Sequence, residues 1–223
     1  SPLYPSALHQ KSRIYLQAKQ YDKAYAVASD GRKRFPDTKE LWGVEAYALV
    51  KLNKYGEAEK LLKKALERAP KDEELLFTLG SVQDEGGKKD EAMKTMEALL
   101  EVSPKNFQAM NYVGYSLAEK NTDVKRALVL ITAALEQRPD ADYIVDSLAW
   151  VHYRLGNLEE AWKAINRCIS LGGDEATIWD HYGDIAKAMG KRDEAIKGYT
   201  EAIARKPANV ADIRKKLAEL QKK

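Results

Sequence analysis

The chain has 223 residues, of which 44% are hydrophobic and 32% are charged, so it has enough apolar residues to fold and is not an intrinsically disordered chain. Its 37 basic and 34 acidic residues are spread along the sequence and give a formal net charge of +3, which excludes a large basic field for nucleic acid or anionic lipid. The single cysteine, Cys168, excludes an internal disulfide and an all-cysteine metal site, and it leaves both reducing and oxidising compartments open.

No segment of the sequence is expected to cross a membrane as a helix. The longest mainly apolar run, Ala127 to Leu135, is well short of the roughly 20 residues that span a bilayer. The chain begins at Ser1 without an initiator methionine or a charged and then apolar leader. We therefore expect either a mature form or a segment of a longer protein.

Prolines mark a repeat along the chain. They are separated by 34, 34, 35 and twice 34 residues, and Gly173 occupies the one position in the series that lacks a proline. The series consists of Pro36, Pro70, Pro104, Pro139 and Pro207. A fixed period of this length predicts stacked helical repeats.

Two further series keep the same spacing. Twelve residues ahead of each proline position stands an alanine: Ala24, Ala58, Ala92, Ala127, Ala161 and Ala195. The eighth position of each unit is small: Ser12, Ala46, Gly80, Gly114, Ala149 and Gly183. Small residues are needed where two helices cross closely, so each unit is predicted to be a hairpin of two packed helices.

In chain order we assign six repeats of about 34 residues and one final helix. The repeats are residues 5–38, 39–72, 73–106, 107–141, 142–175 and 176–209. The final helix, from about Val210 to Lys222, carries an apolar stripe of Ile213, Leu217 and Leu220, while Lys215, Lys216 and Glu219 are expected to face water. It is predicted to cap the array by covering the last repeat.

Local turn chemistry agrees with these hairpins. Gly86 with Gly87, Gly156 and Gly190 follow the first helix of three repeats and suit a positive φ there. The first repeat departs most from the pattern, because Lys11 stands where an apolar residue is expected. An ion pair between Lys11 and Glu45 of the second repeat is one interpretation of that departure.

The sequence resembles the tetratricopeptide repeat family over almost its whole length. The family pattern of a large residue, leucine-glycine, alanine, aromatic, alanine and proline is matched best by Trp179, Tyr182, Gly183, Ala195, Tyr199, Ala202 and Pro207. The resemblance implies an all-α, right-handed α-solenoid of six repeats plus a capping helix. It also implies that residues 1–223 form a single superhelical domain with a concave groove.

In the resembled family the groove is lined by the first helix of each repeat. Reading the corresponding positions here gives an aromatic-rich strip with one amide in the middle repeats: Tyr47, Phe77, Asn111, Tyr115, Tyr143, Trp150 and Tyr153. Tyrosine and tryptophan are frequent anchors at protein interfaces, so the strip favours capture of a polypeptide. The alternative is that Tyr47, Phe77 and Tyr115 only fill gaps between adjacent helices.

Polar residues of the same helices admit two interpretations. Asn111 can bond the backbone of an extended ligand, because its amide both donates and accepts, or it can be an ordinary exposed amide. Asp146, Asp180 and Asp184 can make an acidic end of the groove that prefers a basic segment, or they can be solvated helix carboxylates. The lysine, arginine and asparagine set with which some family members hold a chain-terminal carboxylate is not found in three successive repeats.

The sequence offers no pattern for catalysis. The three histidines lie in different repeats without zinc-ligand spacing, and His181 beside Asp180 and Asp184 is interpreted as part of a solvent-facing helix turn. Cys168 takes a position that is mostly alanine in other repeats, so it is expected to be buried and slow to react. We expect no cofactor, no metal and no enzymatic activity.

The runs from Asn111 to Ala118 and from Asp146 to Gly156 resemble paired repeats of exported bacterial tetratricopeptide proteins. That resemblance implies a scaffold in a bacterial envelope or secretion assembly, periplasmic or associated with the outer membrane. The sequence therefore predicts a protein or peptide partner. Two alternatives stay open: a substrate-docking arm of an enzyme whose catalytic domain lies outside this chain, and RNA binding, which the three aspartates disfavour.

Overall fold

The computed structural model describes residues 3–221, and in this range every regular element is a helix. The chain divides into two compact units, Ser1–Pro104 and Lys105–Lys223. Unit 1 contains α1 (Leu3–Gln17), α2 (Tyr21–Arg34), α3 (Lys39–Lys51), α4 (Tyr55–Arg68), α5 (Glu73–Glu85) and α6 (Lys89–Val102). Unit 2 contains α7 (Phe107–Glu119), α8 (Val124–Gln137), α9 (Asp142–Arg154), α10 (Leu158–Ser170), α11 (Ala176–Ala188), α12 (Arg192–Ala204) and α13 (Val210–Gln221).

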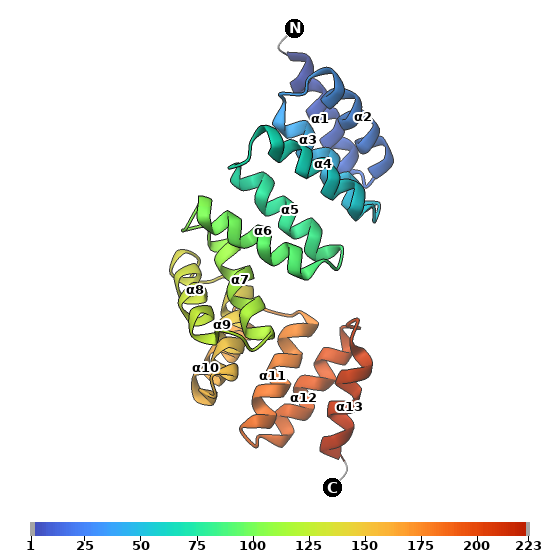
Figure 1. The fold of residues 1–223 in the computed structure, drawn as a ribbon. Helices are drawn as coiled ribbons and strands as arrows, with labels where there is room; N and C mark the ends of the chain where they lie inside the picture. The colour runs from blue at the N-terminus through green and yellow to red at the C-terminus, as the bar shows by residue number, and fades with distance from the viewer. Residues whose placement is uncertain (1–2, 222–223) are drawn as a thin grey trace. The chain divides into compact units, whose positions relative to one another are not determined.

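Within each unit the helices form successive hairpins (Figure 1). In unit 1 these are α1 with α2, α3 with α4 and α5 with α6, and in unit 2 they are α7 with α8, α9 with α10 and α11 with α12. Each hairpin also packs on the next one in its unit, for example through α2 on α3 and α10 on α11. The all-α helical repeat fold predicted from the sequence is confirmed.

The small residues of the two sequence series lie where the helices of each hairpin cross. The six alanines that stand twelve residues ahead of the proline positions are all fully buried. A Cβ added at Gly183 would stand 2.5 Å from the Tyr199 ring, and one at Gly114 would stand 2.8 Å from Ile131. These approaches are too short for a side chain, so the close crossing expected from the sequence is confirmed.

Each hairpin turn contains a residue in the left-handed conformation, and the turn between α7 and α8 contains a second one, Asp123. The positive φ falls on Lys19, Asn53, Gly87, Asn121, Gly156 and Gly190, which keep the repeat spacing. Gly86 was expected to share this conformation, but its φ is −78°. A glycine is therefore not required at this turn, because lysine and asparagine take the same conformation in unit 1 and in the first hairpin of unit 2, at a modest cost.

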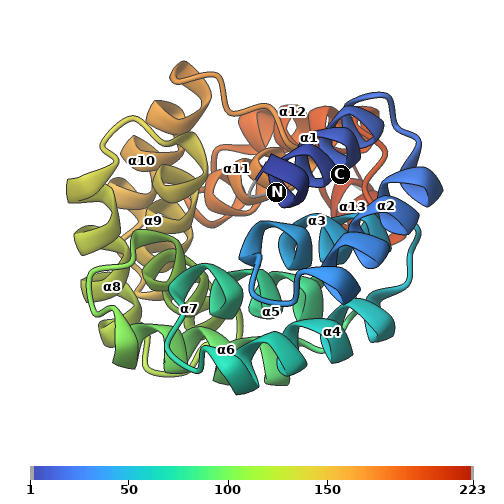
Figure 2. The same ribbon diagram turned by 90° about the horizontal axis from the view of Figure 1, so that it is seen from above.

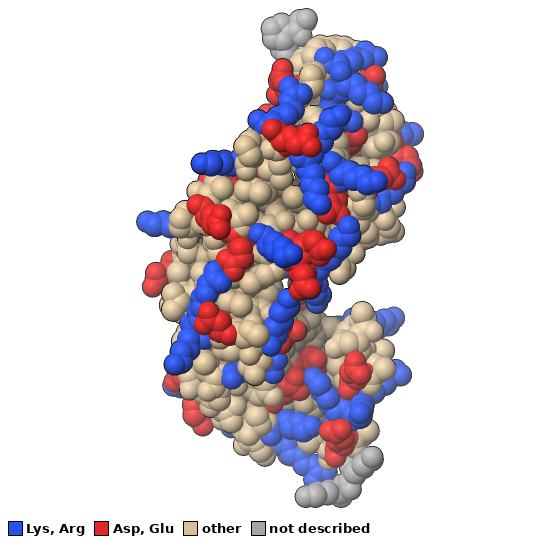
Figure 3. Space-filling model, viewed as in Figure 1, with Lys and Arg blue, Asp and Glu red and all other residues tan. Residues whose placement is uncertain are grey.

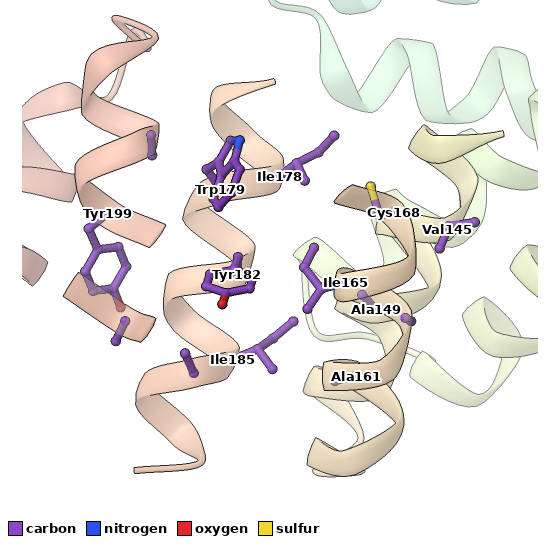
Figure 4. Close-up of a cluster of buried hydrophobic side chains, with 14 of the residues drawn as sticks. Val145, Ala149, Ala161, Ile165, Cys168, Ile178, Trp179, Tyr182, Ile185 and Tyr199 are labelled. Atoms are coloured by element: carbon purple, nitrogen blue, oxygen red, sulfur yellow. The ribbon is translucent and has the colours of Figure 1, made fainter. Parts of the chain in front are cut away.

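The core of unit 2 is continuous from α9 to α13. In Figure 4, Ile165 and Cys168 of α10 point toward Ile178 and Ile185 of α11. Tyr199 of α12 is fully buried in the same cluster. Burial of such side chains contributes roughly 1.5–3 kcal/mol each, so this cluster holds two hairpins and the last helix together.

Helix α13 covers the end of this core. Ile213 is buried, and Leu217 and Leu220 pack against the cluster, as the apolar stripe predicted. Lys216 was expected to face water, but its ammonium is partly buried in ion pairs with α11. Lys222, the expected last residue of this helix, lies outside the described residues. No helix between residues 3 and 221 is both long and apolar enough to cross a membrane.

Unit 1 has its own core and its own buried charges. Glu45 of α3 is 3% exposed and accepts from Arg32 of α2, whose guanidinium also lies 4.8 Å from the centre of the Trp42 ring. The expectation that Lys11 pairs with Glu45 is therefore wrong, because Arg32 occupies that carboxylate and the side chain of Lys11 is exposed.

Candidate functional site

Unit 2 contains a cavity of about 480 Å³ between its first helices and α13. In Figure 2, α7, α9 and α11 lie along one side of this unit, while α8, α10 and α12 lie along the other. The cavity is lined by side chains that include Tyr115, Trp150, Arg154, Asp180, His181, Asp184 and Lys216. We call it the unit 2 cavity.

Repeat register places these side chains together. Tyr115 of α7, Trp150 of α9 and Asp184 of α11 occupy the same ninth position of three successive repeats. Helix α7 packs on α9 and α9 packs on α11, so equivalent positions recur along one surface. The cavity is a consequence of stacking, and its chemistry depends on which residues fill that position.

Aromatic rings form one wall of the unit 2 cavity. The rings of Trp150 and His181 are stacked, with centroids 4.1 Å apart and planes inclined by 17°. Tyr153 stacks on Trp150 at 4.9 Å, and Tyr115 lies 6.1 Å from His181. Burial raises the pKa of the Tyr115 hydroxyl, which therefore remains protonated. This wall therefore consists of packed aromatic rings that carry polar groups at their edges.

His181 is a buried residue, although the sequence suggested a solvent-facing one. Its side chain is 5% exposed, and its Nδ1 lies 2.9 Å from Oδ1 of Asp146, which is itself buried. Burial alone disfavours the charged ring, but attraction to Asp146 outweighs this effect and raises the pKa of His181. The pair holds the imidazole in place against Trp150.

Asp180 and Asp184 share one cation. The Lys216 ammonium lies 2.8 Å from Asp180 and 2.7 Å from Asp184. The Tyr199 hydroxyl also donates to Asp184, at 2.8 Å. These contacts raise the pKa of Lys216 despite its burial. The sequence left two alternatives open for these aspartates: an acidic end of the groove, or solvated carboxylates. The structure shows neither, because Asp180 and Asp184 pair with Lys216 and Asp146 pairs with His181.

Arg154 anchors the edge of the aromatic wall. Its guanidinium donates to the main-chain oxygens of Ala118 and Glu119 at the end of α7, at 2.8 and 2.7 Å. It also lies 5.2 Å from the centre of the Trp150 ring. Arginine thus bonds main-chain carbonyls at the end of α7 and covers one part of the indole.

Three buried polar atoms on α7 and α9 lack partners. Among residues 3–221, they are Nε1 of Trp150, Oδ1 of Asn111 and Nδ1 of His152. Trp150 is 7% exposed and lines the unit 2 cavity. A buried donor or acceptor without a partner costs roughly 1–3 kcal/mol, so native proteins rarely keep one without a reason.

The other residues predicted from the sequence are spread between the two units. Tyr47 and Phe77 belong to unit 1, where Tyr47 is half exposed beside the Lys51 ammonium and Phe77 is partly buried. Tyr143 of unit 2 is also half exposed and is not among the cavity residues. The predicted residues that line the cavity are therefore Tyr115, Trp150, Asp180 and Asp184. Tyr153 stacks on Trp150 and Asp146 pairs with His181, and Asn111 is not among the cavity residues.

Sequence reasoning missed six residues of this site. Five of them were not predicted at all: Glu119, Arg154, Thr177, Asn209 and Lys216. The sixth, His181, was considered only for metal or catalytic roles. Nothing in the sequence links Lys216 with Asp180, since the two are 36 positions apart and in different elements.

Within residues 3–221 no group of three metal-ligating side chains is found. On the face in Figure 3, charges of both signs alternate with uncharged surface.

Three sequence families match parts of the chain, and each is described as a tetratricopeptide repeat. The matched residues are 9–73, 49–111 and 176–209. A TPR repeat-containing protein of Pseudomonas aeruginosa is 28% identical over 181 residues, which are 81% of this chain. The match covers only 30% of that protein, so the chain spans less than a third of its length.

Solved structures share the fold at low sequence identity. A chain of the APC/C hetero-tetramer Cut9-Hcn1 matches 99% of this chain and 43% of its own length, with a TM-score of 0.82 and 15% identity. PilW, a type IV pilus biogenesis factor, matches 94% of this chain and 98% of its own length, with a TM-score of 0.76 and 19% identity. YrrB, described as a TPR protein with an unusual peptide-binding site, matches 77% of this chain and 88% of its own length, with a TM-score of 0.60 and 18% identity.

Proposed function

Because this chain belongs to the tetratricopeptide repeat family, we propose that it is a non-catalytic interaction module whose unit 2 cavity binds a segment of a partner polypeptide. The observation that carries this proposal is the indole of Trp150: this residue lines the cavity, and its buried N–H has no hydrogen-bond partner within residues 3–221. A ligand that supplies an acceptor there removes the cost of the unpaired donor.

A peptide group has the chemistry that this surface requires. Its carbonyl accepts from a donor such as the indole of Trp150, and its N–H donates to an acceptor such as the amide oxygen of Asn111, which also lacks a partner but is not among the residues that line the cavity. Stacked aromatic rings also offer apolar contact to a chain that lies along them. A cavity of about 480 Å³ is within the usual range of ligand sites and accommodates part of an extended segment.

The setting of this interaction is a second part of the proposal. PilW is a pilus biogenesis factor, and YrrB is described as having a peptide-binding site. Both share only the fold with this chain. The proposed setting, a bacterial envelope or secretion assembly, rests on the resemblance of the sequence to exported repeat proteins. Tyr143, Tyr153 and Asp146 are proposed as further contact or supporting residues of the unit 2 interaction, and Tyr47 and Phe77 as partner-contacting residues of unit 1.

An alternative function rests on the length of the relative. The chain spans 30% of the Pseudomonas aeruginosa protein, so this module can be one part of a larger protein. In that case the unit 2 cavity docks a substrate polypeptide for a catalytic domain elsewhere. Sequencing the complete reading frame separates the two functions, because only the alternative requires a catalytic domain in the same chain.

The proposed function is tested by finding the segment and then removing the indole N–H donor from the site. A photoreactive residue at the exposed Thr177, on the rim of the cavity, is crosslinked in native extract, and the attached peptide is identified by mass spectrometry. The corresponding synthetic segment is then titrated calorimetrically into the wild type and into Trp150→Phe. We expect Trp150→Phe to bind about tenfold more weakly, because phenylalanine keeps an aromatic ring but lacks the N–H.

Trp162→Phe is the matched control, since Trp162 belongs to α10 of the same unit and does not line the cavity. It is expected to bind like the wild type. Equal affinity of Trp150→Phe and wild type for the crosslinked segment would contradict the proposal.

A further inference from the structure

Helix α13 contributes a charged side chain to the unit 2 cavity, although its apolar stripe makes it a cap. Lys216 reaches across to α11, and its side chain is 31% exposed. Its ammonium contacts Asp180 and Asp184, whose side chains are 13% and 16% exposed. Three charged groups therefore meet at one wall of the cavity, and two of them are acidic.

The two carboxylates need this ammonium. Asp180 and Asp184 are four residues apart on α11, so they lie on one face of the helix and repel each other. Lys216 contacts both, and the hydroxyl of Tyr199 holds Asp184 from the other helix of the hairpin. The Lys216 ammonium also lies 5.6 Å from the centre of the Tyr199 ring. Side chains of α11, α12 and α13 together therefore hold the two carboxylates and the ammonium in place.

Lys216 is held in this place by the packing of its helix. Ile213 is buried in the core of unit 2, and Leu217, the next residue after Lys216, packs against the same core. Lys187 of α11 donates to Glu219 one turn further along α13, and Arg192 donates to the main-chain oxygen of Leu220. The ammonium therefore does not sample the cavity freely.

The remaining charges near the cavity are also balanced or exposed. Asp146 is paired with His181, and Arg154 is bound to the carbonyls at the end of α7. Glu119 stands at the rim with an exposed side chain, where solvent and salt screen it. The cavity thus offers hydrogen-bonding and aromatic groups but no buried charge without a partner.

We propose that Lys216 is the specificity-determining residue of the unit 2 cavity: by pairing with Asp180 and Asp184 it makes the cavity select an uncharged stretch of polypeptide over a basic one. This inference rests on the proposed function. A lysine or arginine of a ligand gains nothing at the two aspartates unless it displaces Lys216, which exchanges one cation for another. An uncharged stretch requires no such exchange.

The inference is tested with two small probes that differ only in charge. N-acetyl-lysine methylamide and N-acetyl-norleucine methylamide have side chains of equal carbon length, and both carry the peptide groups that the cavity is expected to bond. Each is titrated into ¹⁵N-labelled protein while the indole N–H signal of Trp150 is followed by NMR. Comparison with the spectrum of Trp150→Phe assigns that signal.

In the wild type we expect the lysine probe to bind no more tightly than the norleucine probe. In Lys216→Met the two carboxylates lose their cation, so the lysine probe should bind about tenfold more tightly than the norleucine probe. Lys216→Arg restores the cation and should restore the wild-type pattern. Lys215→Met removes an exposed charge from the same helix and should also leave the wild-type pattern unchanged.

Two results overturn the inference: a preference of the wild type for the lysine probe, or absence of tight lysine-probe binding to a folded Lys216→Met. If that variant does not fold, Lys216→Gln, which keeps a donor without the charge, takes its place, and the wild-type comparison still decides. The probes are not partner segments, so this test is separate from the Trp150→Phe titration. If Trp150→Phe binds the crosslinked segment as tightly as the wild type does, while the two probes behave as expected, the proposed function is rejected and the role of Lys216 is retained.

Discussion

Units 1 and 2 use the same hairpin but bury their charges in different places. In unit 1, Glu45 pairs with Arg32 of the preceding hairpin, and Glu59 of α4 contacts Lys88 and Gln83 of the following one. In unit 2 the buried charges stand around a cavity: Asp146 with His181, and Asp180 and Asp184 with Lys216. In both units these pairs join neighbouring elements, and in unit 2 His181, Asp180, Asp184 and Lys216 also line a cavity.

The largest expected change in unfolding free energy distinguishes the ion pair of unit 2 from that of unit 1. Asp146→Ala leaves the buried His181 without its partner and should lower the free energy of unfolding of unit 2 by about 3 kcal/mol. Glu45→Ala in unit 1 should cost only about 1 kcal/mol, because Arg32 is 17% exposed and its guanidinium can reach water. Urea unfolding followed by circular dichroism measures both. Equal losses would mean that the two pairs do not differ as their burial indicates.

A pair of glycine variants tests whether the units unfold separately. Gly183→Ala places a methyl group 2.5 Å from the Tyr199 ring and should destabilise unit 2 by about 2 kcal/mol. Gly43→Ala in α3 meets no atom within 4 Å and should stabilise unit 1 by up to about 1 kcal/mol, because alanine favours a helix. Two resolved transitions that move in opposite directions are expected. A single transition would show that the units unfold together.

The pH dependence of stability should have opposite signs in the two units. Hydrogen bonds from Lys63 and Lys88 lower the pKa of Glu59 to about 2, so its contribution is present above a pH of about 4.5 and is lost as the pH falls toward 2. The pKa of His181 is raised, so its contribution is complete below a pH of about 6.5 and is lost as the pH rises through the higher folded value.

Thermal unfolding between pH 2 and pH 9 checks this prediction. Glu59→Gln should remove most of the acid dependence of unit 1, and His181→Gln should remove the alkaline dependence of unit 2. An alkaline loss that persists in His181→Gln would contradict the assignment to the imidazole.

The smallest effect on the folded protein is expected at Cys168, which makes it a reporter of unit 2 alone. Its thiol is fully buried, and burial raises its pKa to about 12. The Sγ lies 3.2 Å from the main-chain oxygen of Asp142. Labelling by a thiol reagent at neutral pH should be at least about 100-fold slower than that of free cysteine. Rapid labelling of the native protein would show that the α9 to α11 core opens locally.

Much of the fold was predictable because it depends on local periodicity. The six alanines and the small eighth residues are spaced by the repeat, and the structure buries them where hairpin helices cross. The turn conformation was predicted less well: glycine was the expected signal, but Lys19, Asn53 and Asn121 also adopt the left-handed conformation. Regular spacing of that conformation, not residue type, is what the turns share.

The sequence by itself determined the helical repeat, the apolar face of α13 and the register that brings Tyr115, Trp150 and Asp184 to equivalent positions, because each follows from spacing along one chain. Only the tertiary structure decided the charge of the site. It pairs Asp180 and Asp184 with Lys216 and Asp146 with His181, across elements more than 30 residues apart. The physical reason is that electrostatic energy depends on distance in space and on burial, and neither is encoded in a repeat period.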